Sequence, residues 1–393
     1  MANDAVIVSA CRTPIGSFMG TLAAIPAPKL GALVVEEAVR RAGLRKTDVN
    51  EVIMGNVLAA GEGQAPARQA ALFAGLPESV ECMTINKVCG SGLKAVMLAA
   101  QAIRLGDAEV VVAGGMESMS NAPYLLEKGR EGYRMGHGAV YDSMVKDGLW
   151  DVYNDFHMGN AAELCAKECF IPREAQDEFA LLSYSRAQSA WKEGRFKEEV
   201  LPVSVKSKQG DVLVEQDEEP FKTNFDKIPK LKPAFRPDGT VTAANASKIN
   251  DGAAAVVVMS AEKASSLGLK PLARVVTFAS AAKKPEWFTT APADVITKTL
   301  AKAGMQLNDI DLFEINEAFA VVALAVLQIL GADKTKVNVN GGAVALGHPI
   351  GASGARILVT LLHAMRQREV KRGMAALCIG GGEASAMIVE RMS

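Results

Sequence analysis

The sequence repeats one pattern of strands and helices, once near each end of the chain. Three pairs of segments show the repeat: residues 48–50 and 309–311, residues 91–94 and 353–356, and residues 113–115 and 380–382. Their offsets of 261, 262 and 267 residues are similar, which indicates a duplicated folding unit. We expect the two copies to pack face to face, so that equivalent loops surround one crevice.

Short β-branched runs alternate with helical patterns in both copies, which predicts an α/β fold in layers. The first copy is expected to have strands at 6–8, 51–54, 83–85 and 110–112 and helices at 29–43 and 93–105. The second is expected to have strands at 273–276, 311–314, 337–339 and 375–378 and helices at 294–303 and 354–365.

The segment between the copies breaks the repeat. It is rich in proline and charged residues, and its most regular part is a helical pattern at 172–193. A segment of this length is too long for a simple connection. We therefore expect an N-terminal half at 1–117, a loop subdomain at 118–248 that covers the crevice, and a C-terminal half at 249–393.

Charge and composition exclude several classes of function. The net charge is −1, so no global field favours nucleic acid or an acidic membrane. No apolar run reaches the length of a membrane span, and the start of the chain lacks a secretory pattern. Six irregularly spaced cysteines in a long chain suit a reduced compartment. A cytoplasmic protein is expected.

Cys89 lies between a predicted strand and a predicted helix, flanked by Gly90 and Gly92. At a helix N-terminus the unpaired N–H groups and the dipole favour an anion, which would lower the pKa of the thiol and expose a thiolate. The same N–H groups could hold an oxyanion. The alternative is a small buried cysteine at a tight turn.

Three residues of the second copy could complete a site with Cys89. His348, in a glycine-lined loop, could accept the thiol proton, although a lone loop histidine is more often structural. Cys378 ends an apolar strand before three glycines and could exchange a proton with a carbon acid, or could be a buried strand cysteine. Asn316 could hold a water against an oxyanion, or cap the next helix. Cys165 and Cys169 have helical spacing, but no further ligand lies nearby, and no metal site is expected.

These segments together resemble the thiolase family over essentially the whole chain. Asn86-Lys87-Val88-Cys89-Gly90-Ser91-Gly92 resembles the family's acyl-enzyme site. Residues 338–354, which contain Gly347-His348-Pro349, resemble its second signature, residues 378–382 its third, and residues 316–319 a fourth block.

The resemblance implies the thiolase fold, two βαβαβαββ halves in an αβαβα arrangement, and a reversible ping-pong Claisen condensation of two acetyl-CoA. Cys89 would take the acyl group with His348 as its activator, and Cys378 would move the proton of the second acetyl group. One oxyanion would be held by His348 and an Asn316-bound water, and the other by the N–H groups of Cys89 and Gly380. Coenzyme A thioesters would be substrates, and no cofactor is implied.

The resemblance also assigns the binding residues. Coenzyme A would contact His157, Met158, Lys222, Phe235, Ala246, Ser247, Ala318 and Phe319. Met158 and Phe288 would bound the acyl pocket, as in short-chain members, and residues 287–292 and 383–386 are closest to the mitochondrial acetoacetyl-CoA branch. A homotetramer, a dimer of dimers, is implied. The alternatives are a broader 3-ketoacyl-CoA thiolase and a non-catalytic carrier of coenzyme A or lipid.

Overall fold

The computed structural model describes residues 4–207 and 210–392 and shows two halves that together form five alternating layers of helices and sheets. The N-terminal half contains β1 (Ala5–Arg12), α1 (Ala27–Arg41), β3 (Glu51–Gly55), α2 (Pro66–Phe73), β4 (Glu81–Ile85), α3 (Ser91–Leu105), β5 (Val110–Ser118) and β12 (Asn250–Ser260). The C-terminal half contains β13 (Ala273–Ala282), α7 (Ala291–Ala303), β14 (Leu312–Ile315), α8 (Ala320–Leu330), α9 (Ala343–Leu346), α10 (Ile350–Gln367), β15 (Arg372–Ile379) and β16 (Glu383–Arg391).

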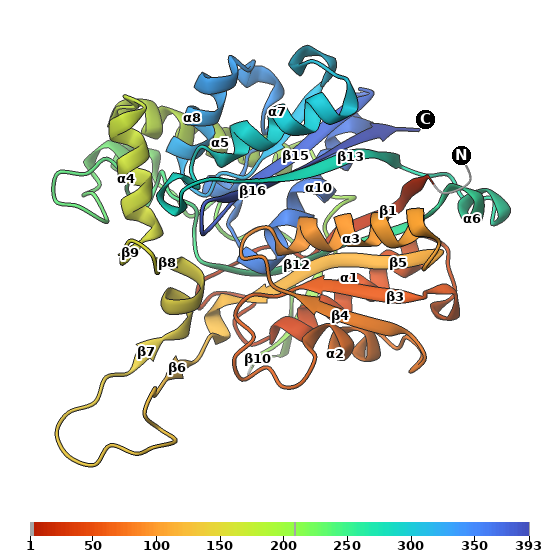
Figure 1. Ribbon diagram of the computed structural model, residues 1–393, viewed down its shortest axis with the longest axis horizontal. Helices are drawn as coiled ribbons and strands as arrows, with labels where there is room; N and C mark the ends of the chain where they lie inside the picture. Colours follow the sequence, from red (N-terminus) through yellow and green to blue (C-terminus); the bar gives the residue numbers. More distant parts are fainter. Residues whose placement is uncertain (1–3, 208–209, 393) are drawn as a thin grey trace.

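The strands form one continuous hydrogen-bonded path in the order β14-β15-β16-β13-β1-β12-β5-β3-β4. The order is nearly symmetric about the β1–β13 junction, where only Val6↔Arg274 and Ile7↔Ala273 pair. Each side therefore behaves as its own sheet, and the two sheets face each other across α3 and α10 (Figure 1). The predicted αβαβα layering is confirmed.

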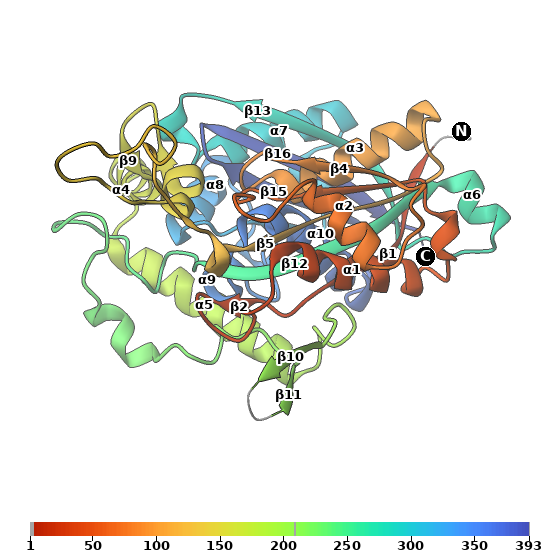
Figure 2. The ribbon, with the colours of Figure 1, turned by 90° about the horizontal axis from the view of Figure 1, so that it is seen from below.

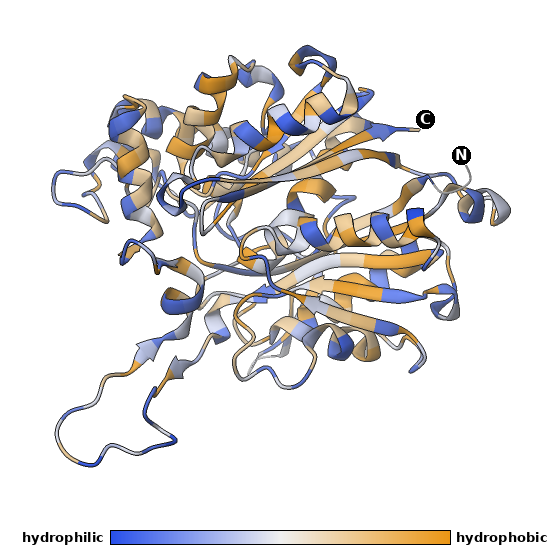
Figure 3. Cartoon of the chain, in the orientation of Figure 1, coloured by the Kyte–Doolittle hydropathy of each residue, from blue (hydrophilic) through white to orange (hydrophobic). Residues whose placement is uncertain are grey.

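Side chains alternate between two cores along each strand, because neighbouring residues of a strand point to opposite faces. In β5, Val111 packs with α3 and α10 in the central core, whereas Val110 and Val112 pack with α1 and α2 in an outer core. Residues of β14 and β16 pack with α7 in a second outer core. Apolar residues accordingly follow the strands of both sheets in Figure 3.

The two central helices cross at a pair of glycines. A Cβ atom on Gly92 of α3 would lie 2.7 Å from the backbone nitrogen of Ala355, and one on Gly354 of α10 would lie 2.3 Å from that of Leu93. Neither contact can be relieved by moving a side chain. The near-symmetric contact allows α3 and α10 to lie closely side by side in the middle layer.

The duplication is confirmed with one correction. The 3₁₀ turns Lys46–Asp48 and Leu307–Asp309 precede the equivalent strands β3 and β14, and Ser91 and Ser353 both lie in the first turn of a central helix. The third pair is out of register. β3 pairs Val52 with Val112 and β14 pairs Phe313 with Met374, so the counterpart of Gly114 is Ala376, within β15. Residues 380–382 instead form the turn after β15.

Two further expectations need correction. β12 pairs with β1 and β5, so residues 250–260, which the expected boundary assigns to the C-terminal half, form a strand of the N-terminal sheet. The expected strand at 337–339 is only an isolated parallel bridge between Val337 and Phe313. The remaining expected elements are present, most of them longer at one or both ends than the sequence pattern indicates.

The inserted segment carries the short pairs β6 (Tyr124–Leu125) with β7 (Tyr141–Asp142), β8 (Trp150–Asp151) with β9 (Phe156–His157), and β10 (Val203–Ser207) with β11 (Gly210–Val214), together with α4 (Met158–Glu168) and α5 (Arg173–Lys192). The loop between β6 and β7 projects away from the body in Figure 1, and β10–β11 lies on another side in Figure 2. Among the described residues, one stretch, Val88–Leu105, is long and apolar enough to cross a membrane. It is 56% buried, because α3 lies in the central layer.

Candidate active site

Cys89 lies in a tight turn between β4 and α3, as the sequence indicates. Val88 has a φ of 44°, in the left-handed region that a β-branched residue rarely adopts. The Ser91 hydroxyl holds the turn: it donates to the Val88 carbonyl (2.7 Å) and accepts from the Lys87 N–H (2.8 Å). A Cβ on Gly90 would lie 2.3 Å from Cδ1 of Ile379, so this turn packs directly on the end of β15.

The Cys89 thiol is neutral at rest. Burial raises its pKa to about 11, although the N–H groups of Gly380 and of Cys89 itself lower it in part. The expectation that the helix N-terminus lowers this pKa is wrong, because loss of water outweighs the dipole in this enclosed position. The Gly380 contact shows that the loop after β15 reaches the sulfur of the N-terminal half.

His348 lies in the buried loop between α9 and α10. Its backbone N–H donates to Asn250 Oδ1 (2.9 Å), and its Nδ1 lies 2.6 Å from Ser353 Oγ. The Ser353 hydroxyl donates its own hydrogen to the Pro349 carbonyl (2.8 Å), so Nδ1 is the donor and Nε2 keeps its lone pair. Burial, with a contribution from Arg356, lowers the pKa of His348 to about 3. A neutral imidazole is thus ready to accept a proton at Nε2.

The C-terminal sheet supplies two further candidate groups, Asn316 and Cys378. Asn316 Nδ2 lies 3.5 Å from both ring nitrogens of His348, and its Oδ1 is buried with no hydrogen-bond partner among the described residues. Cys378, near the end of β15, is 1% exposed. Burial raises the pKa of its thiol well above the ordinary value, and the charge of Cys89, when ionised, raises it further. The two thiols are therefore electrostatic neighbours.

A cavity of about 290 Å³ opens onto these groups. Its walls include eleven residues indicated by the sequence: Cys89, His157, Met158, Phe235, Ala246, Ser247, Phe288, Ala318, Phe319, His348 and Gly380. Cys378 packs against Met158, Phe288, Ala318 and Phe319 in the adjoining core, behind the wall. The structure thus brings together groups from both halves and from the inserted segment.

The entrance side of the cavity is shaped by the inserted segment. The His157 ring stacks on Phe235 with centroids 4.8 Å apart, and Phe235 meets Phe319 edge-on. A second cavity of about 370 Å³ shares Phe235, Ala246 and Ser247 with the first and includes Lys222. Lys222 Nζ lies 2.6 Å from Glu218 Oε1 and 2.9 Å from Ser17 Oγ, so this lysine is already paired at the outer opening.

Sequence reasoning missed several lining residues. Met119, Leu149, Lys248, Ile249 and Ile350 also border the inner cavity. Most are apolar and lie in irregular segments, so no periodic pattern marks them. The sequence patterns also do not explain the charged residue Glu383 next to the triple glycine. In the structure its carboxylate forms an ion pair with Nζ of Lys87, two residues before Cys89. No group of three or more metal-ligating side chains occurs within 4–207 and 210–392.

Known proteins share this sequence and architecture. The model of the thiolase N-terminal domain matches residues 5–262, and that of the thiolase C-terminal domain matches residues 269–391. The chain is 58% identical to the acetyl-CoA acetyltransferase of Cupriavidus necator over 391 residues, covering 99% of this chain and 100% of that protein. It is 55% identical to the mitochondrial acetyl-CoA acetyltransferase of Bos taurus over 392 residues, covering 99% and 92%.

Solved structures agree with the same assignment. The acetyl-CoA acetyltransferase of Bacillus anthracis superimposes with a TM-score of 0.97 at 44% identity, covering 99% of each chain. The Acat5 thiolase of Ascaris suum in complex with coenzyme A superimposes with a TM-score of 0.94 at 47% identity, covering 99% of this chain and 100% of the other. With both halves matched and the duplicated fold present, the chain belongs to the thiolase family.

Proposed function

We propose that the protein is an acetyl-CoA C-acetyltransferase, which joins two acetyl-CoA molecules reversibly to give acetoacetyl-CoA and coenzyme A. The observation that carries the proposal is a cavity lined by the Cys89 thiol and the neutral imidazole of His348, with the buried thiol of Cys378 in the core behind its wall. The relatives named above, which are acetyl-CoA acetyltransferases, and the coenzyme A complex of the Ascaris suum thiolase support the substrate class.

In the first half-reaction Cys89 attacks the thioester carbonyl, and His348 Nε2 accepts the thiol proton. The N–H groups of Cys89 and Gly380, close to the sulfur, suit the developing oxyanion. Collapse of the tetrahedral intermediate breaks the bond to the sulfur of coenzyme A, which leaves with the proton from His348. The products are the acetylated Cys89 and free coenzyme A.

In the second half-reaction Cys378, as thiolate, removes a proton from the methyl group of a second acetyl-CoA. The resulting enolate oxygen would accept a hydrogen bond from a water bound to Asn316, whose Oδ1 has no other partner among the described residues, and one from His348 only when Nε2 carries a proton. The enolate carbon then attacks the acetyl group and displaces the Cys89 thiolate. The proton that Cys378 removed from the methyl group passes to Cys89, which regenerates the Cys89 thiol and the Cys378 thiolate.

The cavity supports a short acyl group. Met158 and Phe288 are both buried and line the cavity where it adjoins Cys378. We propose that His157, Phe235, Ala246, Ser247, Ala318 and Phe319 border the pantetheine, and that Lys222 faces the phosphates in the outer cavity. Activity measured with acetoacetyl-CoA and with longer 3-ketoacyl-CoA thioesters tests this limit: equal rates for long chains would contradict it.

A mass spectrum after incubation with acetyl-CoA tests the central step. We expect one added acetyl group per chain, located on the peptide that contains Cys89 and absent from the Cys89→Ser variant. A protein that binds coenzyme A but gains no acetyl group is a carrier, and the proposed function would be wrong.

We also propose a homotetramer. β4 is the outer strand of the N-terminal sheet, with Met83 exposed on it, and is available to a second copy. Tyr124 of β6 and Leu126 and Met135 of the projecting loop after it are exposed, and large exposed apolar side chains favour a contact. Replacing residues 126–140 by a short glycine–serine linker should convert the tetramer to a dimer in light scattering.

The cytoplasm remains our proposed compartment. All six cysteines are free thiols, which suits a reducing environment. Fractionation of the source cells, followed by immunodetection in the cytosolic fraction, tests it; detection only within an organelle would contradict it.

A further inference from the structure

One face of α10 is polar although the helix lies in the core. Ser353, Arg356, Thr360 and His363 follow one another at spacings of three, four and three residues, and all are buried. Their contacts are Ser353 Oγ with His348 Nδ1 (2.6 Å), Arg356 Nη1 with Glu314 Oε2 (3.6 Å), Thr360 Oγ1 with Glu199 Oε1 (3.0 Å) and His363 Nε2 with the Ala10 carbonyl (3.3 Å). This polar face thus starts at the catalytic imidazole.

Arg356 and Glu314 are costly members of this face. Each side chain is only 2% exposed, and their contact is longer than a hydrogen bond. Both carboxylate oxygens of Glu314 and both Nε and Nη1 of Arg356 are without hydrogen-bond partners among the described residues. Desolvation of such a pair commonly exceeds its attraction, and two apolar side chains of similar volume often give equal or greater stability. Stability alone therefore does not account for the pair.

The pair connects the two elements that position the reacting groups of the C-terminal half. Glu314 lies in β14, and Asn316 follows two residues later, so their side chains share the face that meets α10. Arg356 lies one turn after Ser353, which holds His348 Nδ1. A shift of α10 relative to β14 would therefore change the 3.5 Å separation between Asn316 and the imidazole.

We propose that Arg356 is a positioning residue for His348: through Glu314 it sets the place of α10 against β14, and through Ser353 the orientation of the imidazole. The assignment rests on the proposed function for the identity of the reacting groups. Arg356 is not among the residues that line the inner cavity.

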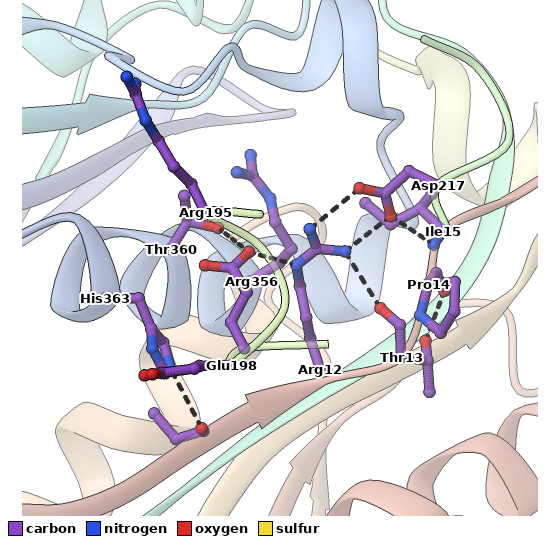
Figure 4. A network of polar contacts seen from close by, with 12 residues as sticks. Arg12, Thr13, Pro14, Ile15, Arg195, Glu198, Asp217, Arg356, Thr360 and His363 are labelled. Atoms are coloured by element: carbon purple, nitrogen blue, oxygen red, sulfur yellow. Dashed lines mark hydrogen bonds and ion pairs between the residues drawn. The ribbon is translucent and has the colours of Figure 1, made fainter. Parts of the chain in front are cut away.

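Thr360 makes its hydrogen bond to a different group of residues, although the charges of Arg12 and Glu199 also act on Arg356. Figure 4 shows the Arg12 guanidinium beside Asp217, with Arg356, Thr360 and His363 on the neighbouring helix. Arg12 Nε also bonds Glu199 Oε1 (2.7 Å), the acceptor for Thr360. These contacts connect Thr360, in the middle of α10, to β1 and to the inserted segment. Thr360 lies more than one helical turn beyond Ser353. Thr360 therefore provides a matched control on the same face.

The test is a double-mutant cycle in which the reactivity of the Cys89 thiol is measured directly. Arg356→Met is made in the parent and in His348→Asn, and alkylation of Cys89 by iodoacetamide at pH 8 is followed by mass spectrometry. We expect about 100-fold slower alkylation in the parent background, because misplacing a reacting group by about 1 Å costs about that factor. In His348→Asn the same change should slow alkylation less than about twofold. Equal slowing in both backgrounds would show a merely structural role and overturn the proposal.

Two further variants keep the test decisive. Glu314→Leu with Arg356→Met replaces both charges by apolar groups and is expected to fold even if the single variant does not. It should show the same slow alkylation, with the KM for coenzyme A in thiolysis within about twofold of the parent and kcat reduced. Alkylation at the parental rate would overturn the proposal.

Thr360→Val is the control and should be alkylated at the parental rate. Slowing as large as that of Arg356→Met would also overturn the proposal. Absence of acetylation in the unsubstituted protein would defeat the proposed function without altering the outcome of the cycle.

Discussion

The central helices α3 and α10 occupy equivalent positions in the two halves but serve their reacting groups differently. Ser91 and Ser353 lie in the first turn of each helix, 262 residues apart. Ser91 closes the turn that carries Cys89 through backbone contacts alone. Ser353 instead contacts the side chain of His348. The same serine thus fixes a backbone in one half and an imidazole in the other.

The bodies of the helices differ accordingly. The buried face of α3 is apolar, with Leu93, Val96, Met97 and Ile103 among its members. α10 carries buried polar groups at each turn. The strained local turn sets the position of the nucleophile Cys89, so the contacts of the rest of α3 matter little for that position. A histidine on a loop depends on how the following helix is placed, and that placement requires directional contacts.

The largest difference between the halves should appear when each thiol is removed. Cys89→Ala removes the group that takes the acetyl, so no acyl-enzyme should form and the overall rate should fall by more than about 10⁴-fold. Cys378→Ala should still acetylate at Cys89 but lose carbon–carbon bond formation. Burst acetylation by mass and condensation by absorbance measure the two steps. Equal loss of both steps in Cys378→Ala would contradict the division of roles.

Loss of the imidazole should change the pH dependence of Cys89. In His348→Asn no base accepts the thiol proton, so alkylation follows the thiolate fraction of a thiol whose pKa burial raises to about 11. The thiolate fraction increases with pH, so the rate should rise about tenfold per unit between pH 7 and about 10. At pH 7 it should be about 10²-fold or more below the parent, within the range for a lost proton acceptor. A parental rate at pH 7 would exclude His348 as the base.

Substitutions at the helix crossing should damage both halves. Gly354→Ala and Gly92→Ala each place a Cβ within 3 Å of backbone of the facing helix, which overpacks the central layer by about 3 kcal/mol. Gly354→Ala should lower the free energy of unfolding more, because its nearest contact is 2.3 Å rather than 2.7 Å. Denaturant unfolding with fluorescence measures both. Gly106→Ala is a useful comparison, since no atom lies within 4 Å of its Cβ position, although its φ of 82° adds strain.

The paired serines should separate catalysis from stability. Ser353→Ala removes the hydrogen-bond partner of His348 Nδ1 and should reduce kcat about 10-fold. The loss of one hydrogen bond should also lower the free energy of unfolding by about 1 kcal/mol. Ser91→Ala should instead lose about 1–3 kcal/mol, since it leaves backbone groups of the strained turn unpaired. Steady-state thiolysis and thermal unfolding of both variants provide the comparison. Equal changes in kcat and in stability for the two variants would show that the two serines do not have different roles.

The smallest effect should come from the ion pair between Lys87 and Glu383, which joins the two halves near Cys89. Lys87 and Glu383 are 24% and 38% exposed, so solvent screens their attraction and Glu383→Gln should cost less than about 1 kcal/mol. Activity should stay within about threefold, because Gly90 packing on Ile379 still holds the same junction. A much larger loss of kcat would mean that the pair positions Cys89.

Sequence patterns located most of the fold because their signals are local. β1, β3, β5 and β15 are β-branched or apolar runs buried on both faces, and α3 and α10 have clear helical spacing. The glycine repeat was misaligned because two short glycine runs look alike, although one lies within a strand and the other in a turn. The role of β12 was missed because strand order depends on partners that lie far away in the sequence.

The amino-acid sequence by itself determined the duplicated architecture, the family and the chemical types at the site, since residue identity and spacing carry that information. Only the tertiary structure decided that the Cys89 thiol is neutral at rest, that His348 keeps its proton on Nδ1, and that Glu383 faces Lys87. It alone showed the polar face of α10 and its pairing with β14. The physical reason is that protonation and pairing depend on burial and on neighbours contributed by distant segments, which no local pattern of residues encodes.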